Sequence, residues 1–302
     1  MVKEVNFALI FANSPLQHAY HHFWEHKISF GIGNNILLDK TLHHWINDGL
    51  MGVFFFVVGL ELKREIIGGE LSNPRKAILP IVAGLGGMIF PALIYLFFNQ
   101  TGEAHSGWGI PMATDIAFAL GVLFLLGKRV PTSLKVFLTV LAIADDLGAV
   151  LVIALFYTSD ISFTSLLIGS GFLLLLILSN KLGVRNTIYY GILGVGGLWI
   201  AFLVSGVHAT IAGVLAAFTI PANVKIDEIG FIEKMKNYLQ KFKEADPNGV
   251  PTVTPEQLHI LEDMRTLSKQ AMTPLQRLEH GMHPFVTFVV MPIFALANAG
   301  VT

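Results

Sequence analysis

Long runs of uncharged apolar residues constrain this chain more than any other feature. Residues 77–98 form a stretch without a charged side chain, and residues 161–178 form a second. A helix crosses the hydrocarbon core of a bilayer with about 20 apolar residues. Only 14% of the residues are charged, whereas soluble domains carry roughly 25%. The sequence therefore predicts an all-α, polytopic helical membrane protein.

Further apolar runs extend this pattern along the chain. We expect spans at residues 45–60, 77–98, 107–127, 136–157, 161–178, two within 187–223, and a last one from 284, after a short apolar stub at 5–12. Residues 1–223 then hold spans one to eight, if the truncated first span is counted. Residues 224–280 form a mixed-charge cytoplasmic segment, and residues 281–302 form the last span.

The basic residues predict the orientation of these spans. If the N-terminus is cytoplasmic, 18 of the 20 Lys and Arg residues fall in cytoplasmic segments, and only Lys27 and Lys40 lie outside. This bias is the positive-inside rule. The chain has no cysteine, which excludes disulfides, thiolate metal sites and a cysteine nucleophile. The net charge of −1 gives no sign of a nucleic-acid partner.

Two segments are expected to contact water. Outside the membrane, residues 27–40 have the pattern of two short strands around a Gly/Asn turn. On the cytoplasmic side, residues 228–242 form an amphipathic pattern that predicts a surface helix. Residues 246–249, Asp-Pro-Asn-Gly, then predict a turn.

Asp145 and Asp146 are adjacent acids in the middle of an expected span. An acid at a helix centre costs about 2.5–3.5 kcal/mol on insertion scales, so the pair should face water, a cation or a partner. Carboxylates this close titrate as a coupled pair. We predict that they exchange protons for a hard cation such as Na⁺. The simpler interpretation is a protonated acid pair that joins two helices.

The segment at residues 109–115, Gly-Ile-Pro-Met-Ala-Thr-Asp, predicts an interrupted helix. Pro111 removes a backbone donor within a span. Thr114 and Asp115 have the character of an N-cap before the next apolar run. The ends of the half-helices would carry partial charge at mid-membrane, and Asp115 would compensate the positive end. The alternative is a helix that starts at Thr114.

Glu61, Arg64 and Glu65 share one helix face at the cytoplasmic end of a span, because they are three and four residues apart. Taken alone, they are best explained as an ordinary solvated helix end. Near the start of the last span, His280 and His283 accompany an acid. Histidines that titrate near neutrality suit a pH switch, and they are weak evidence for a metal site.

Other histidines have less specific explanations. His208 follows the expected turn at Ser205-Gly206, where a lone histidine is more often structural. Four further histidines lie outside at helical spacing, which could hold a metal, although a wet polar face is the preferred interpretation. They are His18, His21, His22 and His26.

Five sequence motifs carry a resemblance to a known family. They are TDIAFALGV at 114–122, LAIADDLGAV at 141–150, INDGLMGVFFFVVGLELKRE at 46–65, GVHATIAGV at 206–214 and LEHGMHPF at 278–285. Together they closely resemble the NhaA-type sodium/proton antiporters. The resemblance runs in order from residue 11 to the end, except across residues 225–277.

The resemblance implies an inverted-repeat fold with twelve spans and two discontinuous helices that cross at mid-membrane. It also implies residue roles. Asp146 would be the main Na⁺ and proton ligand with Asp145 beside it, and Thr114 and Asp115 would lie in the helix break. The residues of a cytoplasmic, pH-responsive funnel would be Glu61, Arg64, Glu65, Glu279, His280 and His283. Asp48 and His208 match positions that influence activity.

The implied function is secondary exchange of cytoplasmic Na⁺ or Li⁺ for external H⁺ across the bacterial inner membrane, for pH and sodium homeostasis. It needs no cofactor and no enzyme activity. The hairpin at 27–40 resembles the family's homodimer contact. The family continues through three more spans after Gly300, so the second repeat is expected to be incomplete here.

Two other functions remain as alternatives. The chain could be an incomplete, non-transporting membrane fragment, because the spans with the second broken helix and a lysine partner are expected beyond residue 302. An intramembrane aspartyl protease also needs two acids in spans. Its acids must face each other from separate helices, which the adjacent Asp145 and Asp146 do not suit.

Overall fold

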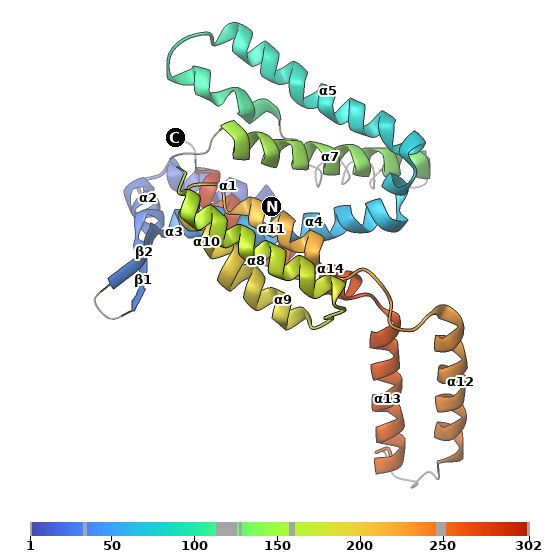
Figure 1. Ribbon diagram of the computed structural model, residues 1–302. Coiled ribbons are helices and arrows are strands. Elements are labelled where there is room, and N and C mark those ends of the chain that lie inside the picture. The colour runs from blue at the N-terminus through green and yellow to red at the C-terminus, as the bar shows by residue number, and fades with distance from the viewer. Residues whose placement is uncertain are drawn as a thin grey trace.

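The computed structural model describes residues 2–32, 35–112, 126, 129–156, 161–245 and 252–300. Within these ranges the chain is almost entirely helical, and one pair of antiparallel strands forms a small sheet (Figure 1). The prediction of an all-α membrane protein is confirmed. Thr114 and Asp115, and with them the predicted helix interruption, lie outside the described residues.

The first half of the chain contributes helices to the bundle and a two-stranded hairpin. They are α1 (Val2–Ala12), α2 (Gln17–Glu25), β1 (Lys27–Ile32), β2 (Asn35–Thr41), α3 (Leu42–Trp45), the π-helical turn η1 (Ile46–Leu50), α4 (Met51–Gly68), η2 (Glu70–Ser72), α5 (Pro74–Phe98) and η3 (Glu103–Met112). The strands confirm the predicted hairpin. Asn73 caps α5 by accepting from the Arg75 N–H at 3.1 Å, and Pro74 suits the first helical position.

The second half adds further helices and a hairpin outside the bundle. They are α7 (Thr132–Phe156), α8 (Phe163–Lys181), α9 (Thr187–Leu193), the π-helical turn η5 (Gly194–Trp199), α10 (Ile200–Ser205), α11 (Thr210–Thr219), α12 (Glu228–Glu244), α13 (Pro255–Ala271), α14 (Pro274–Phe285), the π-helical turn η6 (Val286–Val290) and α15 (Met291–Asn298). The amphipathic helix predicted at 228–242 is α12.

Two helix boundaries follow from local chemistry. Gly206 ends α10 with φ +83°, a left-handed conformation that glycine adopts without a side-chain clash. The predicted turn at Ser205-Gly206 is therefore present. At α14, Thr273 and Gln276 form a capping box before Pro274. The last long helix thus begins at Pro274, ahead of the start at 281 that the sequence suggested.

Four helices in the described part of the chain are long and apolar enough to cross a membrane. They are Ala77–Phe98, Phe163–Lys181, Thr187–Ser205 and Pro274–Asn298. Their apolar side chains point outward as well as inward. Phe98 on α5 is 77% exposed and Leu167 on α8 is 74% exposed. A helix that is apolar all round is suited to lipid rather than to water.

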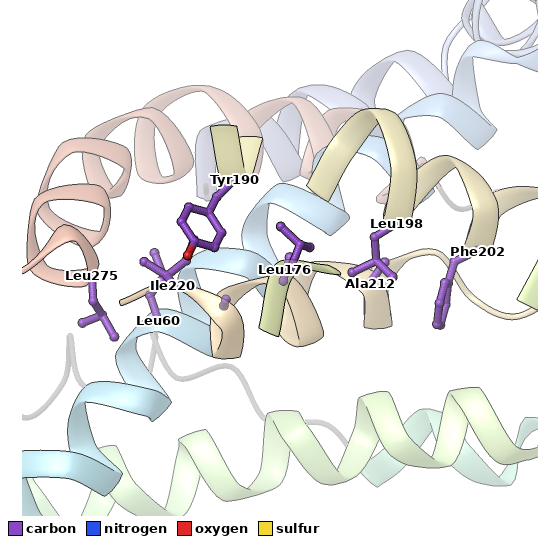
Figure 2. Close-up of a cluster of buried hydrophobic side chains, with 10 residues drawn as sticks. Leu60, Leu176, Tyr190, Leu198, Phe202, Ala212, Ile220 and Leu275 are labelled. Carbon is purple, nitrogen blue, oxygen red and sulfur yellow. The ribbon is translucent and has the colours of Figure 1, made fainter. Parts of the chain in front are cut away.

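A hydrophobic cluster joins α4 to the helices of the second half (Figure 2). Leu60 of α4, Leu176 of α8 and Leu198 of η5 are fully buried, and Ile220 and Leu275 close the cluster at one end. Because lipid tails are as apolar as leucine, such a cluster holds spans together by close packing rather than by exclusion of water.

Small residues let α4 and α11 approach each other closely. A Cβ atom on Gly59 would lie 2.8 Å from the Cβ of Ala217. A Cβ atom on Gly213 would meet the backbone oxygen of Gly52, far inside van der Waals distance. Glycine and alanine at helix interfaces are typical of membrane helices, which associate by backbone proximity. The small residues therefore set the distance between α4 and α11.

The bundle divides into two parts in Figure 1. Helices α5 and α7 run side by side along one edge, and α4, α8, α9, α10, α11 and α14 form the larger group. The hairpin β1–β2 projects from one end of the bundle. The hairpin α12–α13 projects from the opposite end, crosswise to the long axes of α5, α7 and α8.

Candidate ion-binding and regulatory sites

Asp145 lies where α7 packs against α5. Its exposed fraction is 2%. The backbone of α5 comes close at this point, because a Cβ atom on Gly84 would lie 3.3 Å from the Leu141 oxygen and 3.8 Å from the Asp145 nitrogen. Gly148, one turn further along α7, receives the side chain of Met88 from α5. The two glycines thus let α5 and α7 pack closely beside the buried Asp145.

Asp146 follows Asp145 in the backbone of α7. Its side chain lies outside the described part of the structure, as do Thr114 and Asp115. The structure therefore places one member of the predicted ion-binding set, Asp145, in a buried position within an apolar helix. The proximity of the other members to Asp145 stays a prediction.

The structure brings together the charged ends of α4 and α14, which are far apart in sequence. Arg64 of α4 donates to Glu279 of α14 at 2.5 Å and to Glu65 at 2.9 Å. The Glu279 residue is 9% exposed. A charged pair in a partly buried place is held more firmly than an exposed one, because water screens it less. The long-range ion pair contrasts with the ordinary solvated helix end that the sequence favoured.

A polar cavity of about 370 Å³ opens beside this ion pair. Arg64, Glu279, His280 and His283 line it, together with Gln276 and Met272. Five of these six residues belong to α14 or to the turn that precedes it. The predicted funnel residues of the last span therefore face one cavity with Arg64 of α4.

Lys63 is a functional candidate that the sequence reasoning missed. Its ammonium group donates to the backbone oxygens of Phe218 and Ile220, at 2.6 Å each. Asn180 of α8 donates to the Thr219 oxygen between them at 2.5 Å. These oxygens lie at the end of α11, where carbonyl groups lack helical partners and carry partial negative charge. A lysine beside the Glu61–Glu65 cluster was the only signal in the sequence.

A second polar cluster lies at the opposite end of α4. His44 Nε2 lies 2.8 Å from a carboxylate oxygen of Asp48, one helical turn along the chain, and the two form an ion pair when His44 is protonated. Trp199 of η5 donates to the Asp48 backbone oxygen at 3.1 Å. Partial burial lowers the pKa of His44, and the negative charge of Asp48 opposes this shift. Asp48 thus belongs to a cluster that is remote from Arg64.

Asparagines connect this end of the bundle to the last helix. Asn298 of α15 donates to the side chain of Asn47 at 2.9 Å, and its oxygen lies 3.1 Å from His43 Nε2. Tyr20 of α2 also donates to the Leu296 oxygen. Polar side chains are effective links between membrane helices, because lipid offers them no competing partner. These contacts hold α2, α3 and α15 together.

An apolar cavity of about 270 Å³ lies between α4, α9, η5, α11 and α14. Gly49 of η1 and Gly194 and Trp199 of η5 form part of its wall. Its lining offers little to an ion. Among the described residues, no group of three or more His, Asp or Glu side chains could hold a metal ion. Among the described residues, Asp145 and the two polar clusters are therefore candidates for ion and proton chemistry.

Buried acid, lipid-suited helices and paired charges at the helix ends define a class of protein, a polytopic helical membrane protein with ionisable groups inside its bundle. The family model described as Na⁺/H⁺ antiporter 1 matches residues 1–302. The chain belongs to this family. The resemblance stated from the motifs is confirmed, and the protein is a multi-pass membrane protein.

Relatives in several bacteria are similar along nearly the whole chain. The Na⁺/H⁺ antiporter NhaA of Oleidesulfovibrio alaskensis is 53% identical over 98% of this chain. The NhaA proteins of Acidithiobacillus ferrooxidans and, as NhaA 2, of Syntrophotalea carbinolica are 53% and 52% identical over 97% of it. The chain spans 65–67% of the length of these relatives.

Proposed function

We propose that this protein exchanges Na⁺ for H⁺ across a bacterial inner membrane, as a secondary transporter rather than an enzyme. The observation that carries the proposal is Asp145, an acid that is buried in an apolar helix where α5 and α7 pack closely. Intramembrane acids mark ion and proton paths. Membership of the antiporter family and the names of the similar proteins support the same function.

In the proposed mechanism the acid pair on α7 alternates between two occupants. The deprotonated carboxylates of Asp146 and Asp145 bind Na⁺, since carboxylate oxygens are suitable ligands for hard cations. Protonation removes the negative charge, so the Na⁺ ion leaves. Na⁺ and protons thus cannot occupy the acid pair at the same time, and this exclusion couples the two ion movements. No cofactor takes part.

Substitution of the acids tests this proposal. In inverted vesicles that contain the full-length protein, Asp146→Asn should abolish the collapse of a pH gradient on addition of Na⁺, because a neutral amide cannot exchange a proton. Asp145→Asn should weaken Na⁺ dependence. Glu233→Gln, an exposed acid on α12, is the matched control and should retain wild-type exchange. Normal exchange by Asp146→Asn would refute the assignment.

We infer that the cavity at the end of α4 and α14 regulates the exchange by pH. Arg64 holds Glu279 and Glu65, and His280 and His283 line the same cavity. A proton gained by either histidine would add positive charge beside the ion pair. Glu61 belongs to the same charged end of α4. Asp48 and His208 are proposed to influence activity from the opposite end.

A substitution that removes the charge of Glu279 tests the regulatory role. Glu279→Gln should shift the pH dependence of exchange while it leaves the maximal rate largely intact, since Glu279 is on a different helix from the acid pair of α7. The measurement is the Na⁺-induced pH change in vesicles over a range of pH. Complete loss of exchange at every pH would contradict a regulatory role. His259→Gln, an exposed histidine on α13, serves as the control.

The hairpin β1–β2 is proposed to join two copies of the chain in a homodimer. It projects away from the bundle (Figure 1), which places its strands where they can pair with another chain. Deletion of residues 28–38 should lower the dimer fraction in detergent while exchange continues. An unchanged dimer fraction, measured by light scattering, would count against this contact.

A further inference from the structure

Helix α13 carries an exposed face that combines apolar and basic side chains. Leu258 is 50% exposed and Leu261 is 40% exposed. Arg265 and Lys269 are also exposed. The four residues follow one another at intervals of three or four, so they lie on one face of the helix. We call these four residues the outer face of α13.

This face points away from the other helix of the hairpin. The buried side chains of α13 are Ile260 and Leu267, and α12 packs along this helix. By helical periodicity, Ile260 and Leu267 lie on the side opposite Leu261 and Arg265. Packing within the hairpin therefore leaves the outer face uncovered.

Backbone hydrogen bonds hold the two ends of the α12–α13 hairpin to each other and join the segments that connect it to the bundle. The Lys225 N–H donates to the Gln270 oxygen at 3.0 Å, and the Leu275 N–H donates to the Pro221 oxygen at 3.2 Å. The hairpin extends crosswise to the long axes of the spans, with α13 on the side nearer the bundle and α12 on the far side (Figure 1). Since spans cross the bilayer, an element crosswise to them runs along the membrane surface.

We propose that the outer face of α13 binds the anionic phospholipids of the adjacent leaflet. The inference rests on the proposed membrane arrangement of the spans. Leu258 and Leu261 enter the boundary between headgroups and acyl chains, as in interfacial amphipathic helices. Arg265 and Lys269 reach the lipid phosphates, because long basic side chains extend toward headgroups.

Glu262 borders the outer face and opposes its attraction to phosphate, so that attraction depends on Arg265 and Lys269 together with the apolar contacts.

Tethering favours lipid over a free protein partner. The short connections from Ile220 to α12 and from α13 to Pro274 keep the hairpin at the end of the spans. The bilayer surface is therefore available to α13 at a high local concentration, without a diffusional encounter.

The absence of cysteine from the sequence permits a site-specific test. Leu261→Cys carries an environment-sensitive fluorophore on the outer face. Leu239→Cys, a 56% exposed position on α12, carries the same probe as the matched control. The full chain is placed at one copy per nanodisc, in phosphatidylcholine alone or with phosphatidylglycerol. Quenching is measured with aqueous iodide and with a nitroxide-labelled lipid.

In discs that contain phosphatidylglycerol, the probe at position 261 should lose iodide quenching and gain quenching by the nitroxide lipid. The control probe should remain accessible to iodide. The loss of iodide quenching at position 261 should be smaller in phosphatidylcholine, and Arg265→Gln combined with Lys269→Gln should reduce it in phosphatidylglycerol.

Three outcomes would overturn the proposal. They are equal iodide quenching at positions 261 and 239 in every lipid, equal protection in both lipids, and protection that appears in crowded liposomes but not in single-copy discs. The last result would assign the face to a second copy of the chain. The measurement involves no ion exchange, so a failure of the proposed transport function would be recognised separately.

Discussion

Lys63 and Asp145 show how the meaning of a single charged residue depends on its neighbours. Sequence reasoning singled out Asp145 because an acid in an apolar run is costly, and the structure buries it. Lys63 was missed because it stands at a helix end among other charges. Its role comes from the carbonyl groups of Phe218 and Ile220, which are more than 150 residues away.

Removal of the Lys63 ammonium group should destabilise the packing of α11 against α4. Lys63→Met keeps the length of the side chain but leaves the Phe218 and Ile220 oxygens without their charged donor, which should cost roughly 1.5–3 kcal/mol. The measurement is the unfolding temperature in detergent. Lys181→Met, an exposed lysine at the end of α8, is the control. Equal unfolding temperatures for the two variants would contradict the capping role.

At the scale of elements, helices within a membrane have no hydrophobic driving force between them, so they associate by close approach of their backbones. Gly213 of α11 lies against the backbone of α4 at Gly52, and Gly59 of α4 lies against Ala217. Sequence periodicity reveals an apolar helix, but it does not show which glycine meets another backbone. The structure identifies Gly213, whereas Gly171 on α8 has open space beside it.

The two glycines should therefore respond differently to one added methyl group. Gly213→Ala should force α4 and α11 apart and lower stability by about 1–3 kcal/mol, as overpacked cores do. Gly171→Ala should leave stability unchanged or raise it slightly, because alanine has the better helix propensity. Thermal unfolding in detergent compares the two. Similar losses in both variants would argue against a special contact at Gly213.

The β1–β2 hairpin should open at low pH. Hydrogen bonds from Ser29 at 2.7 Å and Lys27 at 3.2 Å lower the pKa of Asp39. The ionised carboxylate is therefore favoured in the folded hairpin. Its stabilisation is complete above the ordinary pKa of aspartate and is lost as the pH falls through the lowered pKa.

Hydrogen exchange of the strand amides, followed against pH and corrected for intrinsic rates, measures this loss. Protection of β1 and β2 should fall in the acidic range for the native chain. Asp39→Asn cannot ionise, so its protection should not follow the titration. A native hairpin whose protection is independent of pH would show that Asp39 contributes nothing.

At the scale of the molecule, the distribution of basic residues predicts a cytoplasmic N-terminus. Helix α5 offers a direct test because Ser72 precedes it and Gln100 follows it, and both are exposed. Since the chain lacks cysteine, Ser72→Cys and Gln100→Cys give single reactive positions at the two ends of one span.

In intact cells, a membrane-impermeant maleimide should label the Gln100→Cys variant and spare the Ser72→Cys variant. In inverted vesicles the preference should reverse, because the cytoplasmic end is then outside. Labelling of Ser72→Cys in intact cells would invert the proposed orientation. The native chain is the control and should remain unlabelled.

The sequence by itself determined the class of protein, since uncharged runs such as 77–98 have no favourable place in water and suit a bilayer. It also determined local features that depend on neighbouring residues, among them the hairpin at 27–40, the turn at Gly206 and the helix α12. These features follow from short-range backbone preferences and side-chain periodicity.

Only the tertiary structure decided which distant groups meet. It placed Arg64 on Glu279, Lys63 on the end of α11 and Gly84 beside Asp145. It also set α13 on the bundle side of its hairpin. Such pairings depend on which helices pack together and at what distance. In an all-apolar bundle that choice comes from small residues and polar contacts, whose partners no local pattern specifies.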